Sequence, residues 1–331
     1  MASLGLPILH AILRTKGREP TTLNSQSPLS RRGILRLAAL GSLTRPAWCL
    51  DSYALPAGGG SIEVSFQPGD FDASPDALRK WIADAAQAAT TYFGRLPVPR
   101  TLLAVRPVPG RAGVLSGVTY PDTPPHTRIS VGQHATAAEL DDDWTLTHEF
   151  SHLAFPNVPQ QHHWMEEGMA TYVEPIARVQ AGNLKPERIW ADMVRDMPKG
   201  LPAPDSHGLD QTRSWANTYW GGAVFCLLAD VQYRERTHNQ RGLQHALRGI
   251  LQAGGSIQED WPITRAFDVA DHAVGVPVLS ELYARMKDTA VPTDLPDLWR
   301  RLGVSAEGRH VTFHNDAELA AVRQAITAKP A

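Results

Sequence analysis

Two histidines four residues apart, His148 and His152, determine how the middle of the chain can fold. They lie in the segment TLTHEFSHLAF, which acidic residues precede and Pro156 follows. Acidic residues favour a helix N-terminus and proline ends a helix, so the segment predicts a short helix. Residues i and i+4 share one helix face, and two imidazoles placed in this way can hold one tetrahedral zinc ion. Glu149, beside the first histidine, is placed to take a proton from an attacking water.

The histidine pair alone leaves a second interpretation open, because apolar residues flank the motif on both sides. A core helix with hydrogen-bonded histidines has the same pattern. A catalytic zinc site needs a third protein ligand and an open fourth position. A third histidine six residues after His152 would complete one known arrangement, but that position is Val158. His162 and His163, in a loop-like QQHH, are weak candidates for the third ligand.

A stronger candidate for the third ligand lies in the segment WMEEGMATYVE, which starts at residue 164. This segment resembles W-L-N-E-G-F-A-x-Y-x-E of the aminopeptidase N family, in which the glutamate before glycine binds zinc. The resemblance implies that Glu167 is the third ligand, with Glu166 in place of the family's asparagine. The family leaves eighteen residues between the second histidine and this glutamate, whereas here fourteen intervene. The chain therefore resembles the wider gluzincin, peptidase-MA-like class as a distant relative.

Two further residues follow from the same resemblance. The segment NTYWGG resembles the Y-E-K-G segment of the family, whose tyrosine stabilises the tetrahedral oxyanion; Tyr219 and Gly222 are the matching positions. A tyrosine packed in a helix is the alternative. Glu174 lies two helical turns after Glu167 and either supports a histidine ring through its free N–H or ends a helix in solvent.

One family motif is missing. Aminopeptidases of that family carry a G-x-M-E-N loop, whose glutamate holds the free amine of the substrate. The corresponding region, GVLSGVTYPDT, has glycines and a strand-like segment but no glutamate. The sequence therefore leaves open whether the protein is an endopeptidase, an aminopeptidase or another amide hydrolase.

The hydrophobic pattern predicts a small sheet followed by helices. Ser74 and Pro75 predict the start of an early helix that Gly94 ends. Strands are predicted at 61–66, 101–108, 116–121 and 127–132, and helices at 142–155, 163–178, 186–197, 214–236, 240–253, 276–287, 293–302 and 315–328, with a loop at 199–208. This order predicts an α+β fold with a small mixed sheet, a zincin-like active-site helix and a mainly helical C-terminal lobe.

The N-terminal region has the composition of a targeting segment. Arg31 and Arg32 precede a short apolar run, as in a bacterial twin-arginine export signal, and small residues around Tyr53–Ala54 offer a cleavage site. A disordered basic leader or an organelle transit peptide is the alternative. We predict a leader over 1–54 that is removed, and a single zincin-like peptidase domain over 55–331, with a sheet-containing lobe to residue 160. The resemblance to an export signal implies a periplasmic or secreted protein.

Charge and composition exclude several classes of function. The first 51 residues carry seven basic and two acidic residues, so the rest of this 331-residue chain has a net charge of −7. An acidic body of this kind argues against nucleic-acid binding. The apolar runs Leu37–Leu43 and Gly221–Leu228 are shorter than the ~20 residues of a membrane helix, so stable membrane insertion is not expected. Two cysteines, Cys49 and Cys226, predict no disulfide framework.

Together these features predict a zinc-dependent metallopeptidase with one Zn²⁺ per chain. His148, His152 and Glu167 would bind the metal, Glu149 would act as general base and Tyr219 would stabilise the oxyanion. The expected partner is a peptide or protein substrate, and the oligomeric state is left undetermined. Three alternatives remain: a zinc hydrolase of a non-peptide substrate, a non-catalytic peptidase-like binding module, and a structural protein with a coincidental motif.

Overall fold

The computed structural model describes residues 52–330 except 204, 213 and 309. The described residues all belong to one compact unit. The predicted leader with Arg31 and Arg32 therefore lies outside the described residues, except for its last three residues, 52–54.

The strands are β1 (Tyr53–Ala57), β2 (Gly60–Phe66), β3 (Arg100–Val108), β4 (Val114–Tyr120), β5 (His126–Gly132), β6 (Val304–Glu307) and β7 (His310–Phe313). The α-helices are α1 (Pro75–Phe93), α2 (Ala137–Asp142), α3 (Thr145–His152), α4 (His163–Ala181), α5 (Pro186–Asp196), α6 (Gly222–Arg236), α7 (Leu243–Gln252), α8 (Ile263–Val274), α9 (Leu279–Met286), α10 (Leu295–Leu302) and α11 (Ala320–Thr327). Shorter helical segments are η1 (Gln160–His162), η2 (Met197–Gly200), η3 (Leu209–Gln211) and the π-helical η4 (Asn217–Gly221).

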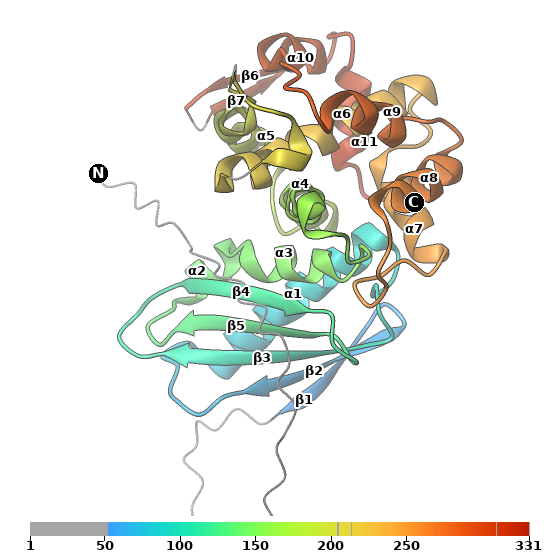
Figure 1. Ribbon diagram of the computed structural model, residues 1–331. Coiled ribbons are helices and arrows are strands. Elements are labelled where there is room, and N and C mark those ends of the chain that lie inside the picture. The colour runs from blue at the N-terminus through green and yellow to red at the C-terminus, as the bar shows by residue number, and fades with distance from the viewer. Residues whose placement is uncertain (1–51, 204, 213, 309, 331) are drawn as a thin grey trace, which may run out of the picture. The chain divides into compact units, whose positions relative to one another are not determined.

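A mixed five-stranded sheet with the order β1-β2-β3-β5-β4 forms one part of this unit (Figure 1). β2, β3 and β5 run parallel, whereas β1 and β4 pair antiparallel with their neighbours at the two edges. A register shift between Val114 and Ser116 interrupts the pairing of β4 with β5. β4 is therefore an edge strand, and α3 packs against it.

The helix α1 forms where the capping residues predict it. Ser74 accepts a hydrogen bond from the Ala77 backbone at 3.2 Å, Pro75 occupies the first turn, and Gly94 ends the helix at φ +79°. A positive φ at this position favours glycine. The buried face of α1 carries Trp81 and Ile82 onto the sheet.

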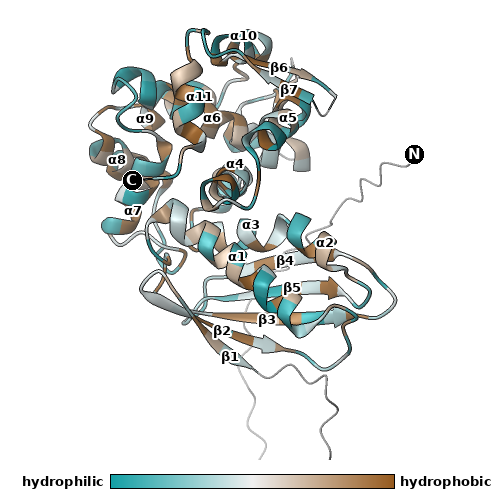
Figure 2. Cartoon of the chain, turned by 180° about the vertical axis from the view of Figure 1, so that it is seen from behind, coloured by the Kyte–Doolittle hydropathy of each residue, from teal (hydrophilic) through white to brown (hydrophobic). Residues whose placement is uncertain are grey.

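Two apolar cores hold the unit together, and α1 contributes to both, whereas α3 contributes to the sheet core. The sheet core contains Ile62, Leu103 and Ile129 from the strands, whereas the helical core surrounds α4 with residues such as Trp164 and Phe225. In the view from behind, α1 lies across the sheet with a hydrophilic outer face (Figure 2). The cores therefore meet where α3 passes between the sheet and α4 (Figure 1).

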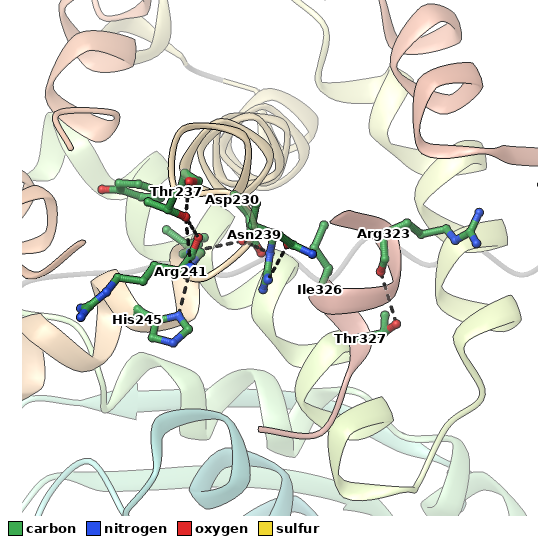
Figure 3. Close-up of polar contacts among 12 residues, drawn as sticks. Asp230, Thr237, Asn239, Arg241, His245, Arg323, Ile326 and Thr327 are labelled. Carbon is green, nitrogen blue, oxygen red and sulfur yellow. Dashed lines mark hydrogen bonds and ion pairs between the residues drawn. The ribbon is translucent and has the colours of Figure 1, made fainter. Parts of the chain in front are cut away.

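A buried carboxylate fastens α4 to α6 and α7. Asp230 accepts hydrogen bonds from the Tyr172 hydroxyl at 3.0 Å, from Arg234 Nε at 2.9 Å and from the Leu243 backbone N–H at 3.0 Å. Beside it, Thr237 closes the turn into α7 by accepting from the Arg241 backbone N–H at 3.0 Å (Figure 3). Because buried charges need such partners, this network fixes the helices around α4 in one arrangement.

The α+β class is confirmed, with differences in detail. β1 and α8 had not been predicted, and α3 is shorter than the predicted helix at 142–155. The C-terminal region, predicted as helical, also contains the β6–β7 hairpin, in which Gly308 adopts φ +61° at the turn. In the described part of the chain, no helix has both the length and the hydrophobicity of a membrane span.

Candidate metal centre

The helix α3 owes its position to Asp143. The Asp143 carboxylate accepts hydrogen bonds from the backbone N–H groups of Thr145 at 2.9 Å and Leu146 at 3.1 Å. It also accepts one from Trp81 Nε1 at 2.9 Å, which ties the start of α3 to α1. The helix therefore begins at a fixed point, and its next turn carries His148 and Glu149 into the interior.

The helix α4 brings a third candidate ligand, Glu167, to the two histidines. Glu167 Oε2 lies 3.2 Å from His148 Nε2 and 3.7 Å from His152 Nε2, and the three donor atoms all lie within 4.8 Å of one another. Ligands at zinc-bond lengths of ~2.0–2.1 Å at the corners of a tetrahedron would be about 3.4 Å apart. The donor set therefore fits a zinc ion in number, chemistry and spacing.

The charges at this cluster favour a carboxylate ligand. Burial opposes ionisation of Glu167, but the nearby His152, His148 and His163 outweigh it and hold the pKa of Glu167 well below its usual range. Burial likewise opposes the charged form of His148, and the Glu167 carboxylate more than compensates, so its pKa is raised. Glu167 is therefore an anion, the form that a metal requires.

The predicted base, Glu149, is buried beside the ligands and held by the edge strand. Its Oε2 accepts a hydrogen bond from Thr119 Oγ1 at 2.8 Å, and the Thr127 hydroxyl lies 3.0 Å from the Thr119 hydroxyl. Burial raises the pKa of Glu149 to about 7, against the opposing effects of His148 and Thr119. Thr119 was not singled out in the sequence. It lies in a predicted strand, but it is thirty residues away from Glu149 in the sequence. No local pattern could therefore predict that the two residues are in contact.

Gly117 allows β4 to approach the base this closely. A Cβ at that position would lie 2.5 Å from Glu149 Cγ and 2.9 Å from Glu149 Oε1. Contacts shorter than 3.0 Å would force the carboxylate or the strand to move. A glycine is therefore needed in this strand if Glu149 is to reach Thr119.

Tyr219 lies in η4, and its ring stacks on His148 with 6.0 Å between centroids and an interplanar angle of 9°. Burial and the charge of Glu167, to which its hydroxyl hydrogen-bonds, raise the pKa of Tyr219. A π-helical turn is a common feature of functional sites, because it shifts the side chains of the helix that follows.

A close approach of two helix backbones brings Tyr219 to the ligands. A Cβ on Gly168 in α4 would lie 2.2 Å from Gly222 Cα, and a Cβ on Gly222 would lie 2.1 Å from the Trp164 carbonyl oxygen. These two glycines are the ones that the sequence resemblance matched to family glycines. Their physical role is to let α4 pack closely against the start of α6, directly after η4.

The remaining candidates occupy supporting positions. His163 Nε2 lies 3.3 Å from Glu167 Oε1, and its Nδ1 lies 2.9 Å from Glu166. Burial opposes its charged form, but these two carboxylates raise the pKa of His163 to about 10. His162 instead pairs with Asp210 at 3.0 Å. The sequence treated His163 only as a candidate ligand and did not predict its contact with the ligand carboxylate.

Glu174 has a different partner from the histidine that the sequence suggested. Its carboxylate accepts a hydrogen bond from Arg178 Nη1 at 2.9 Å, and Arg178 Nη2 donates to the Asp141 carbonyl. Both side chains are buried. His148 Nδ1 is buried without a hydrogen-bond partner among the described residues, so Glu174 supplies no bond to that ring.

A cavity of about 840 Å³ opens beside the centre, and His148 and Tyr219 form part of its wall. It continues between α4 and α5 and is lined by both polar and apolar side chains. A second cavity, of about 460 Å³, is lined by residues from η2, η3 and the end of α9 and contains none of the five predicted site residues. We therefore assign the larger cavity to the candidate centre.

The fold resembles that of an aminopeptidase N family protein from Idiomarina loihiensis, with a TM-score of 0.57 and 14% identity over 77% of this chain and 49% of that one. An M1 zinc metallopeptidase from Deinococcus radiodurans gives a TM-score of 0.48 and 14% identity, over 73% and 53% of the two chains. The chain thus spans about half the length of each structure. No family model and no curated protein matches the sequence. The chain therefore has the fold of an aminopeptidase N family structure, to which it is distantly similar.

Proposed function

We propose that the protein is a zinc-dependent metallopeptidase that hydrolyses peptide bonds. The observation that carries the proposal is the convergence of His148 Nε2, His152 Nε2 and Glu167 Oε2 within 4.8 Å, with the Glu149 carboxylate on the same helix as the two histidines. A structural zinc site needs four protein ligands and no base. Three ligands and an adjacent buried carboxylate instead suit hydrolysis.

A zinc ion held by His148, His152 and Glu167 would polarise the scissile carbonyl and activate a water for attack. Glu149 accepts the proton of the attacking water and passes it to the leaving amine. Its pKa of about 7 suits both transfers, because the carboxylate can then gain and lose a proton near neutral pH. The hydrogen bond from Thr119 holds the carboxylate in one orientation during these steps.

Tyr219 stabilises the charge that develops on the carbonyl oxygen. Because burial and the Glu167 charge raise its pKa, the phenol keeps its proton at neutral pH and remains a hydrogen-bond donor. A donor of this kind, aimed at a developing oxyanion in a site with little water, lowers the barrier more than it would in bulk solvent.

The substrate proposed is a peptide or protein outside the cytoplasm, on the strength of the twin-arginine-like leader. The strand β4 contains no acidic side chain, and Asp122 is the first carboxylate after it in the sequence. A carboxylate is the group that would hold the free amine of an aminopeptidase substrate. We therefore propose cleavage within chains as well as at their N-terminus.

The test uses the full chain and its Glu149→Gln variant. Each is loaded with Zn²⁺ and analysed for bound metal, then incubated with quenched peptides that have free or acetylated N-termini. We expect one zinc per chain in both proteins, and cleavage by the wild type that falls by at least about 10²-fold in the variant. Cleavage of acetylated peptides would identify an endopeptidase.

Three results would contradict the proposal. Absence of bound zinc would remove the site. One zinc in both proteins, with no cleavage of any peptide, would favour a binding module or hydrolysis of a non-peptide substrate. Equal cleavage by both proteins would show that Glu149 is not the base.

A further inference from the structure

Two exposed tryptophans stand one helical turn before two residues of the candidate centre. Trp144 lies four residues before His148, at the start of α3, and Trp215 lies four residues before Tyr219. Trp144 is 42% exposed and Trp215 is 54% exposed, whereas Trp164 is 1% exposed. Only one other large hydrophobic residue in the described part of the chain is classed as exposed, Tyr120 at 36%. Exposed apolar side chains gathered at one place mark a binding surface.

The two tryptophans and the centre form one continuous row of rings. The Trp144 ring meets His148 edge-on, with 5.3 Å between centroids, and His148 stacks on Tyr219. Tyr219 in turn stacks on Trp215, with 4.9 Å between centroids and an interplanar angle of 24°. The middle of the row consists of His148, a proposed metal ligand, and Tyr219, the proposed oxyanion donor. At each end, a tryptophan indole is exposed to solvent.

Both tryptophans line the 840 Å³ cavity that begins at His148 and Tyr219. Its volume is within the range of sites that enclose small ligands. It can therefore hold one substrate side chain together with the adjacent residues of the substrate. Apolar residues of α5, such as Ile189 and Met193, extend the same wall.

Most of the charged side chains that line the cavity are paired with one another. Arg178 is paired with Glu174, Arg188 with Asp142, and Arg195 with both Asp192 and Asp196. With Lys185 and Glu187, the lining has four basic and five acidic side chains, so its net charge is small. The aromatic surface remains as the feature that can distinguish one substrate from another.

We propose that this cavity binds an aromatic side chain of the peptide substrate next to the scissile bond, and that Trp144 and Trp215 select it. The inference rests on the proposed peptidase function and names its substrate class. Indole rings offer wide flat surfaces on which an aromatic ring can stack or meet edge-on, and such contacts add to the gain from burial.

The first experiment measures specificity. Zinc-loaded full-length protein is given quenched peptides that differ in one residue, Phe, Leu, Ala, Asp or Lys, placed on either side of the cleaved bond. We expect kcat/KM for Phe to exceed that for Ala by on the order of tenfold or more at one of the two positions. The position that shows the preference identifies whether the cavity binds the substrate residue before or after the cleaved bond.

Variants of the two tryptophans distinguish a loss of substrate selectivity from a general loss of activity. In Trp215→Ala we expect the Phe-to-Ala ratio to fall towards one, and in Trp215→Phe we expect most of it to be kept. A displaced Tyr219 would instead lower kcat for every peptide and leave the ratio unchanged. Trp144→Ala tests the contribution of the second tryptophan in the same way.

Binding of an aromatic ligand can also be measured without any cleavage reaction. Titration calorimetry compares N-acetyl-phenylalaninamide with N-acetyl-alaninamide on Glu149→Gln protein, with and without the Trp215→Ala change. We expect tighter binding of the phenylalanine amide, and loss of that difference when Trp215 is removed.

The outcomes distinguish the two proposals. Cleavage with a preference for small or charged residues, or a preference that neither tryptophan variant alters, overturns the inference and leaves the peptidase function standing. No cleavage, together with tryptophan-dependent binding of the phenylalanine amide, overturns the peptidase function and keeps the aromatic ligand class. Neither cleavage nor selective binding overturns both.

Discussion

At the scale of single residues, the Glu149 carboxylate depends on a hydroxyl from a different element. Thr119 Oγ1 contacts both the side chain and the backbone carbonyl of Glu149, at 2.8 Å and 3.1 Å. Its hydroxyl also lies against that of the buried Thr127. A general base works only when its carboxylate faces the water that it deprotonates, so this contact would position Glu149 for its proposed role.

Replacement of Thr119 by valine keeps the shape of the side chain and removes the hydroxyl. A hydrogen bond to a charged group contributes about 1.5–3 kcal/mol, so we expect kcat to fall by roughly 10- to 100-fold. KM should change little, because Thr119 is not among the residues that line the cavity. Steady-state kinetics check this, and Thr119→Ser should keep most of the activity. A fall of the same size in Thr119→Ser would show that packing of the methyl group, rather than the hydroxyl, matters.

At the scale of elements, α4 is the helix around which the site is assembled. It carries Glu167, receives Tyr219 through the contact of Gly168 with Gly222, and is fastened from the far side by the bond from Tyr172 to Asp230. The packing of two glycines brings the helix backbones closer than any other residue would allow. The geometry of the site therefore depends on α4 and η4 remaining in contact.

We expect Gly168→Ala to separate α4 from the start of α6, and so from η4, which directly precedes it. The added Cβ would lie 2.2 Å from backbone atoms of Gly222, which cannot rotate away as a flexible side chain could. Overpacking of this kind costs about 1–3 kcal/mol in the free energy of unfolding. Chemical denaturation measures that loss, and kinetics should show a lower kcat as Tyr219 moves away from the centre.

A matched control lies on the same helix. Thr171 has a buried hydroxyl without a hydrogen-bond partner among the described residues, so Thr171→Ala should change the stability much less than Gly168→Ala. Equal stability of the wild type and Gly168→Ala would mean that an added methyl group fits between Gly168 and Gly222, contrary to the close approach of their backbones.

At the scale of the whole molecule, the candidate centre joins two parts of the fold. The histidines lie on α3, which packs on the sheet core, and Glu167 lies on α4 within the helical core. A metal bound by residues from both helices stabilises the folded chain, because the unfolded chain does not hold the three ligands together.

We expect added Zn²⁺ to raise the melting temperature of the metal-free protein. A ligand at 100 times its Kd adds about 2.7 kcal/mol, which for a chain of this size corresponds to roughly 5–10 °C. Calorimetry or fluorescence melting after chelation and re-addition checks the shift. Glu149→Gln should respond as the wild type does, whereas Glu167→Gln should respond much less. An unchanged shift in Glu167→Gln would exclude that residue as a ligand.

Local chemistry let the sequence predict much of the fold and part of the site. Alternating apolar residues predicted four strands, and the capping pair Ser74 and Gly94 predicted the bounds of α1, because these signals act within a few residues. The β6–β7 hairpin was missed because two four-residue strands give too short a pattern beside helices. Helix α8 was missed although its apolar residues have helical spacing.

The sequence by itself placed His148, Glu149 and His152 on one helix turn, because helical geometry relates residues four apart without reference to the rest of the chain. A family resemblance, rather than spacing, suggested Glu167 and Tyr219. Only the tertiary structure decided that these side chains lie together, that Glu174 pairs with Arg178, and that Thr119 hydrogen-bonds to Glu149. It also decided that Trp144 and Trp215 share a cavity. Such contacts join elements far apart in sequence, and packing of the whole chain sets them.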